Sequence, residues 1–289
     1  MAGGGEERAR EALPWEDLGA HPAARAFRES LAELLFRPGS FFRRMARSGG
    51  LHEPLTFAVI LVGAALLLSF PAALAYFGLT APEPARVPAE EYVRHLLAPQ
   101  ATGLAVVLLP FAVAAAAGTA VFLGTLFYLP ARLFGVRNWE GAVSVWVYSL
   151  SGATVPVLLS VGLILAVSTA GYLLGLAVPG SRDFSVPAAR WVARISLGLG
   201  SLAAAGLGLA LTAVGCIRAF DLEAPVGAAA AISGLLAACL ALGAGGWLAF
   251  RLGAAADLSG VAAALAAVGV FAAAGLAVVA LRRGGGGSW

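Results

Sequence analysis

Six runs of the chain contain no charged residue, and each is long enough to cross a membrane as a helix. They cover residues 54–80, 101–131, 141–181, 195–217, 224–250 and 258–281. A helix needs about 20 residues to cross a hydrocarbon core of about 30 Å. Only 12% of the 289 residues are charged, about half the share in a soluble domain. The polar remainder is therefore too small to cover six such helices in water.

These runs predict an all-α fold, a polytopic transmembrane helical bundle of about six spans. Barrel strands alternate polar and apolar residues over about 10 positions, whereas these runs are continuous. The run 141–181 is the difficult one, because a helix of that length would measure about 60 Å. It could form one long kinked span or a hairpin of two short spans that turns near residues 160–162. We favour one long span, because nothing near the middle resembles a polar turn.

The segment before the first span divides into two parts. Residues 1–20 are Gly-rich, then charged, and predict a disordered tail. Residues 21–50 predict an amphipathic interfacial segment, in which aromatic residues lie at the acyl boundary and arginines at lipid phosphates. Three other hypotheses remain: the charges only set topology, the segment packs on a neighbouring protein surface, or it recognises a specific lipid. The predicted membrane-surface residues are Phe41, Phe42, Arg43, Arg44 and Arg47.

Charge placement also predicts orientation. Arginines are concentrated before the first span and in alternate loops, which places the N-terminus in the cytoplasm by the positive-inside rule. The basic residues are all arginine, and Ala, Gly and Leu dominate the rest. This composition is typical of a GC-rich prokaryotic genome and predicts the cytoplasmic (inner) membrane. No signal peptide is expected, because the first apolar run begins near residue 54.

The sequence gives little support to catalysis. No ionisable residue lies inside the charge-free runs, so acid–base and proton-coupled chemistry lack their usual groups. The three histidines fall in three separate polar segments, and none has a second ligand at metal spacing. We therefore expect no catalytic, cofactor-binding or metal-binding residue, no cofactor, and no nucleic-acid partner. Within the spans, prolines predict helix kinks at Pro71, Pro110 and Pro156.

Three stretches resemble the Yip domain family, the Ypt/Rab-interacting membrane proteins and their prokaryotic relatives. They are LLFRPGSFFRRMARSGGLHEPLTFAVI at 34–60, WVYSLSGATVPVLL at 146–159, and VGCIRAFDLEAPVGAAAAI at 214–232. The resemblance implies a five-span Yip-like domain over 51–252, followed by an extra transmembrane helix and a short tail over 253–289. It also implies a membrane-organising or scaffolding role. The small-GTPase partner of eukaryotic relatives is not expected for a prokaryotic chain.

Two functional hypotheses follow. The first is a non-enzymatic, multi-pass membrane protein of Yip type that acts on the lipid bilayer and on other membrane proteins through helix packing and its basic N-terminal face. The alternative is a small-solute permease or channel, in which proline-kinked helices surround an uncharged pathway. A permease requires a water-accessible path near the bilayer midplane, whereas a scaffold requires close helix packing there.

Overall fold

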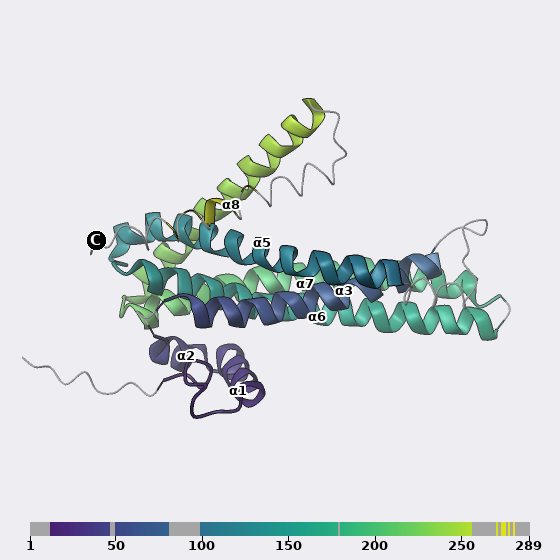
Figure 1. The fold of residues 1–289 in the computed structure, drawn as a ribbon, viewed down its shortest axis with the longest axis horizontal. Coiled ribbons are helices and arrows are strands. Elements are labelled where there is room, and N and C mark those ends of the chain that lie inside the picture. The colour runs from purple at the N-terminus through teal and green to yellow at the C-terminus, as the bar shows by residue number, and fades with distance from the viewer. Residues whose placement is uncertain are drawn as a thin grey trace, which may run out of the picture. The chain divides into compact units, whose positions relative to one another are not determined.

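A computed structural model describes residues 12–46, 50–80, 99–178, 180–255 and six residues between 270 and 280. In these residues every regular element is a helix (Figure 1). Two short helices come first, and five long ones follow. They are α1 (Ala23–Phe36), α2 (Pro38–Arg44), α3 (His52–Thr80), α5 (Pro99–Ala131), the short 3-10 helix η2 (Arg132–Phe134), α6 (Trp139–Ala177), α7 (Arg182–Ala219) and α8 (Ala224–Ala255).

Five of these helices are long and apolar enough to cross a membrane, namely α3, α5, α6, α7 and α8. Their backbone N–H and C=O groups are paired within each helix, as hydrocarbon requires. The prediction of an all-α polytopic bundle is therefore confirmed. The predicted sixth span, 257–281, lies mostly outside the described residues; those that are described, 270, 273–275, 277 and 280, are helical.

The run 141–181 forms one helix and not a hairpin. Helix α6 continues without a break through 39 residues, which corresponds to about 58 Å. The hydroxyls of Ser149 and Ser151 donate to the carbonyls one turn earlier, Val145 and Val147, and so stay inside the helix. The preference for one continuous helix over a hairpin is confirmed. Pro156 lies within α6, Pro71 within α3 and Pro110 within the bounds of α5; that they bend these helices stays a prediction.

The chain divides into two compact units; α3, α5, α6 and α7 contribute to both, and α8 belongs to the first. The first unit contains Met1–Ala58, Gly118–Gly152 and Leu209–Trp289, and the second contains Val59–Ala117 and Ala153–Gly208. The core of the first unit includes Phe127 and Trp146, whose rings stack at 5.6 Å. The buried residues of α8 in this core are all alanine, for example Ala231.

Small residues also bring helices together within each unit. In the second unit, a Cβ on Gly200 of α7 would overlap the Ser160 hydroxyl, which lies 2.8 Å from the Ser196 carbonyl. In the first unit, a Cβ on Gly275 would overlap the backbone of Gly118. Gly118 lies in a stretch of α5 made of small residues, 112–120, which lets backbones approach closely. A Cβ on Gly206 of α7 would meet open space instead.

The α8 glycines allow a stability test. A Cβ on Gly234 would overlap the ring of Phe127, which is fully buried, whereas a Cβ on Gly243 would meet nothing within 4 Å. Gly234→Ala should therefore destabilise the protein by about 1–3 kcal/mol through overpacking. Gly243→Ala is the matched control, and it should be neutral or stabilising by up to about 1 kcal/mol. Thermal unfolding in detergent measures both; equal melting temperatures for the two variants would contradict the packing.

Candidate functional site

The N-terminal segment before α3 folds into a small structure of its own, which we call the N-terminal module (residues 12–46). Helix α1 begins directly after Pro22, and its buried residues Ala26, Ser30 and Leu34 recur every four positions, on one face. Helix α1 ends at Phe36, and α2 starts at Pro38, where a missing backbone N–H does no harm in the first helical turn. Arg37 therefore separates the two short helices, and Pro38 and Gly39 belong to the first turn of α2.

Aromatic side chains attach this module to α3 and α6. Trp15 lies edge-on to Phe27 and Phe57 at centroid distances of 5.7 and 5.8 Å. Phe57 of α3 continues to Tyr148 of α6 at 5.5 Å, and Tyr148 continues to Phe41 of α2 at 4.9 Å. Edge-to-face pairs of this kind contribute about 0.5–1.5 kcal/mol each beyond the apolar area that they bury. The cluster therefore binds two module helices and the loop before them to two long helices.

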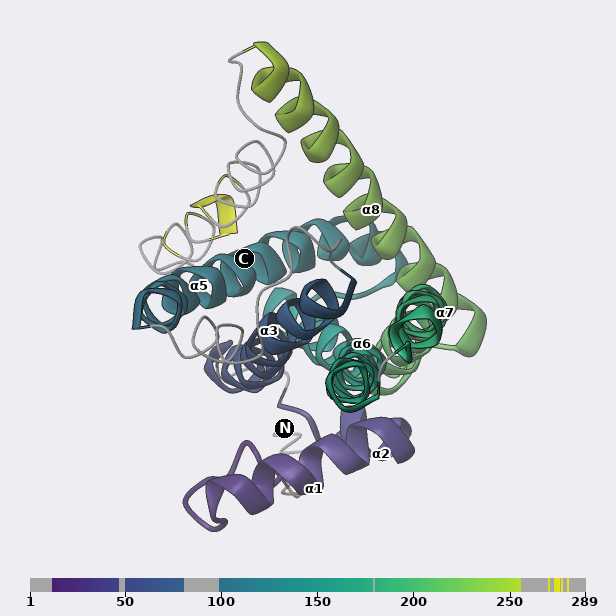
Figure 2. The ribbon, with the colours of Figure 1, turned by 90° about the vertical axis from the view of Figure 1, so that its right-hand side faces the viewer.

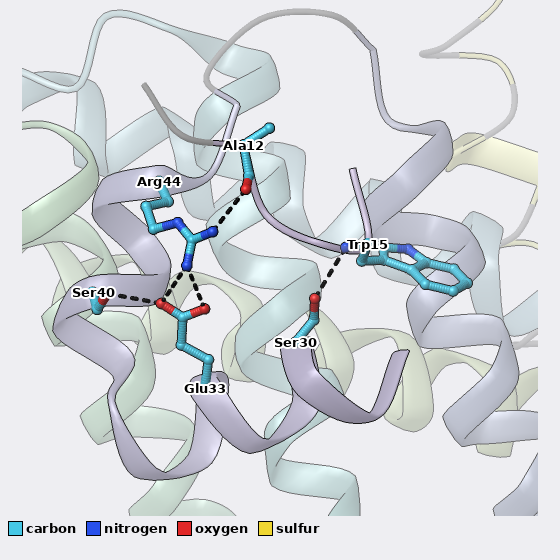
Figure 3. A network of polar contacts seen from close by, with 6 residues as sticks. All are labelled: Ala12, Trp15, Ser30, Glu33, Ser40 and Arg44. Atoms are coloured by element: carbon cyan, nitrogen blue, oxygen red, sulfur yellow. Dashed lines mark hydrogen bonds and ion pairs between the residues drawn. The ribbon is translucent and has the colours of Figure 1, made fainter. Parts of the chain in front are cut away.

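Hydrogen bonds fix the loop that precedes α1. The Trp15 backbone N–H donates to Ser30 Oγ at 3.1 Å (Figure 3). The Trp15 indole N–H donates to the Glu53 carbonyl at 2.9 Å, at the start of α3. A buried indole N–H normally finds such an acceptor. Trp15 thus attaches the module to α3 in two ways, through contacts of its ring and through the hydrogen bond of its indole N–H.

A second polar group joins α1 to α2. The Glu33 carboxylate pairs with Arg44 at 3.0 Å and accepts a hydrogen bond from Ser40 Oγ at 2.7 Å (Figure 3). Arg44 also donates to the Ala12 carbonyl at 2.8 Å. The pair is mostly shielded from water, with exposed side-chain fractions of 27% for Arg44 and 14% for Glu33. Arg44 is therefore a structural residue of the module, and its charge is not free for lipid.

Glu16 places a carboxylate at the centre of this assembly. One of its oxygens accepts from the Ala46 backbone N–H at 3.0 Å, and the other accepts from the Tyr148 hydroxyl at 3.3 Å. Burial raises the pKa of Glu16 above its ordinary value, and the negative charge of Glu53 adds to this. The two hydrogen bonds and Arg44 oppose the rise in pKa. Glu16 thus attaches its segment to α6 through a carboxyl group, and burial of this group costs less free energy when it is protonated.

The predicted membrane-surface residues separate into distinct groups. Phe41 and Phe42 are completely buried against protein, because α2 turns its aromatic side toward α6 and α7. The expectation that these two rings lie at the acyl boundary is corrected by this burial. Arg43 is exposed, and its Nε donates to the Gly39 carbonyl at 3.1 Å. Arg47 lies outside the described residues.

The expectation of a disordered tail over 1–20 also needs correction for the part that is described, residues 12–20. There Leu13 is fully buried, and Trp15 is 4% exposed. The sequence carried one signal that could have indicated this, the apolar pair Leu13 and Trp15 within an otherwise polar stretch. The Gly-rich start and the mixed charges of the stretch are typical of disorder, and they led to the wrong prediction for residues 12–20.

The contacts of this site attach the N-terminal module to α3 and α6, and we call them the joint. Its carboxylates and hydroxyls bind backbone groups or each other, and no group of three metal-ligating side chains occurs among the described residues. Comparisons with protein-family models, curated proteins and solved structures give no match. The resemblance to the Yip domain family therefore stays a prediction from the sequence.

The buried carboxyl group of Glu16 predicts a pH-dependent joint. Its pKa is raised in the docked state, so protonation favours docking; this contribution is complete below the ordinary pKa near 4.5 and is lost as the pH rises through the raised value. The melting temperature of wild type should therefore fall, relative to that of Glu16→Gln, between pH 5 and pH 8. Thermal unfolding in detergent measures this difference in slope.

Asp17→Asn is the matched control, because the neighbouring Asp17 side chain is exposed and its neutralisation should leave the slope as in wild type. A constant offset between Glu16→Gln and wild type is expected, since an amide cannot accept from both partners of the carboxylate. Parallel curves for wild type and Glu16→Gln would exclude the role assigned to Glu16.

Proposed function

We propose that this chain, which its five long apolar helices make an integral, multi-pass membrane protein, is not an enzyme. In this proposal it organises lipid and membrane-protein neighbours, through close helix packing and through a basic surface around the N-terminal module. This is the role that the Yip resemblance implies. The basic surface would face the cytoplasm of a prokaryotic cell, as the positive-inside rule predicts.

The observation that carries this proposal is a separation of charges by burial in the first unit. The carboxylates of Glu16, Glu33 and Glu53 are half-buried, and the first two bind partners inside the module. Many arginines remain at the surface. They are Arg25, Arg28, Arg37, Arg43, Arg132, Arg137 and Arg218. The exposed acids in the described part of this unit, Asp17, Asp221 and Glu223, are fewer than these arginines. The surface is therefore more basic than the composition suggests, and it complements anionic headgroups.

Close packing supports the scaffold part of the proposal. Glycines at helix contacts in both units would clash if they carried a Cβ, as Gly200 and Gly215 would with Ser160 and Val145. Such contacts leave little room for solute between these helices. One observation favours the permease alternative: the buried hydroxyls of Ser168 and Ser185 have no hydrogen-bond partner. Buried polar groups of this kind often bind water.

Arginine neutralisation tests the basic surface. Arg37→Gln with Arg43→Gln removes two exposed charges outside the Glu33–Arg44 pair. Each arginine near an anionic surface contributes about 1 kcal/mol, so the loss of two should lower the preference of the protein for anionic over zwitterionic lipid by about thirtyfold. The measurement is the lipid that stays bound to purified protein after extraction from mixed vesicles. Arg25→Gln is the control, because Arg25 is already paired with Glu29 at 2.7 Å; an unchanged preference in the double variant would remove the lipid role.

A flux assay separates the scaffold from the permease. Vesicles that contain the purified protein should take up small neutral and charged solutes no faster than empty vesicles. If uptake were faster, Ser168→Ala with Ser185→Ala would show whether the unpartnered hydroxyls belong to a path. Faster uptake that these changes abolish would establish the permease and overturn the scaffold proposal.

A further inference from the structure

The last turns of α6 and the first turns of α7 lie side by side within the second unit (Figures 1 and 2). A Cβ on Gly171 of α6 would be 3.3 Å from the Cβ of Ser185 in α7. Ser185 begins a stripe of small, buried residues at helical spacing, which continues through Ala189, Ala193 and Ser196. The Ser196 carbonyl in turn lies 2.8 Å from the hydroxyl of Ser160 in α6. This stripe therefore faces α6, and the opposite side of α7 is turned away from it.

The side of α7 that is turned away from α6 combines apolar and basic residues. Phe184, Pro187 and Trp191 follow one line along the helix, at spacings of three and four residues. Phe184 is 77% exposed, and Trp191 is 63% exposed. Arg190 and Arg194 lie along one edge of this line; both are exposed, and neither forms an ion pair with another described residue. We call these five residues the α7 face.

The charges of α7 place the α7 face outside the hydrocarbon core. Charged side chains in the bilayer interior are costly, so hydrocarbon can contact α7 only beyond Arg194. The charge-free run that follows, 195–217, measures about 35 Å and is long enough to cross a core of about 30 Å. Phe184 lies about 15 Å before Arg194 along the helix, or about 14 Å at a tilt of about 20°, whereas the headgroup layer adds only about 5–8 Å on each side. Lipid therefore does not reach Phe184, and water would surround its ring unless protein covers it.

The chain itself supplies a segment beside the α7 face. Helix α3 ends at Thr80, and the Arg190 guanidinium donates to the Thr80 carbonyl at 3.4 Å. Residues 81–98, which follow, connect α3 to α5 in the same unit and lie outside the described residues. The ten residues from 81 to 90 can span at most about 33–36 Å, while the α7 face is about 15 Å long from Phe184 to Arg194. The segment can therefore reach the whole face.

The sequence of this segment complements the α7 face. Its larger apolar residues recur at the spacing of one helical side; they are Tyr92, Val93, Leu96 and Leu97. Its carboxylates are those of Glu83, Glu90 and Glu91. The second unit has only one other acidic residue in its sequence, Asp183, which lies on α7 itself, about 10 Å from Arg190 along the helix. The segment therefore holds the carboxylates that are available to the two arginines within this unit.

We propose that residues 90–97 dock on the α7 face of their own chain. Their apolar side covers Phe184 and Trp191, and Glu90 and Glu91 pair with the two arginines of the face. A second copy of the chain is disfavoured as the occupant, because the segment is joined to α3 beside Arg190 and so has an effective concentration in the mM range at this surface. The inference concerns the second unit alone and holds for a scaffold as well as for a permease.

Photo-crosslinking in the full chain identifies what covers the α7 face. The photoreactive residue p-benzoylphenylalanine takes the place of Phe184, and the protein is reconstituted as an equal mixture of heavy-isotope-labelled and unlabelled chains. Irradiation should join position 184 to a peptide from residues 81–98, and mass spectrometry should find the same isotope label in both peptides. The matched control carries the probe in place of Leu202, which is 72% exposed within the charge-free run and should capture lipid.

Three results at position 184 would overturn the inference. They are a cross-link to lipid alone, a product that joins a labelled to an unlabelled chain, and the lack of any cross-link to residues 81–98. Capture of the segment by the probe at position 202 would contradict the depth assigned to the α7 face. If the variant at position 184 does not fold, the probe takes the place of Trp191 instead, and the same outcomes decide.

Charge reversal tests the ion pairs. Glu90→Arg with Glu91→Arg should lower the yield of the cross-link at position 184 several-fold, because like charges would then meet at the α7 face. Adding Arg190→Glu with Arg194→Glu should restore the yield, because opposite charges are paired again. Glu83→Arg is the matched control, since this residue lies outside 90–97, and it should leave the yield as in wild type. An unchanged yield after reversal at 90 and 91, or no recovery in the swapped variant, would overturn the pairing.

Discussion

Charge cannot enter hydrocarbon without a partner, and the arrangement of this protein follows from that constraint. The chain keeps its ionic groups out of six long runs, and the described runs become helices that satisfy their own backbone groups. Helices such as α6 and α7 are longer than a hydrocarbon core is thick. In the first unit, the N-terminal module covers part of these two helices, where Phe41 packs on Tyr148 and Phe42 lies close to Gly215.

The module can cover these helices because the polar groups that it buries have hydrogen-bond or ion-pair partners. Trp15 is anchored by two hydrogen bonds, Glu33 accepts from Ser40 and pairs with Arg44, and Glu16 has two donors. Each of these groups would destabilise an apolar contact if it were left unpaired. Because Glu16 and Glu33 are paired in this way, they do not neutralise the exposed arginines. The same contacts therefore stabilise the joint and create the basic surface on which the proposed function depends.

Much of the fold was accessible from the sequence, because length and lack of charge are sufficient to predict spanning helices. The single helix over 141–181 could also be predicted, since a hairpin needs a polar turn that is missing there. The module was only partly predictable. Its helices follow from Pro38-Gly39 and from apolar spacing, but an aromatic pair such as Phe41 and Phe42 looks the same whether it faces lipid or protein. The partners that decide this, Tyr148 and Gly215, are distant in sequence.

That separation along the chain has a consequence for biosynthesis. The module leaves the ribosome before either α6 or α7 exists, yet its buried rings contact residues that are made more than a hundred positions later. Until those helices are inserted, Phe41 and Phe42 lack the α6 and α7 residues that bury them, and exposed apolar groups of this kind promote aggregation. The nascent segment therefore needs a temporary partner, and the nearest apolar phase is the bilayer into which α3 is being inserted.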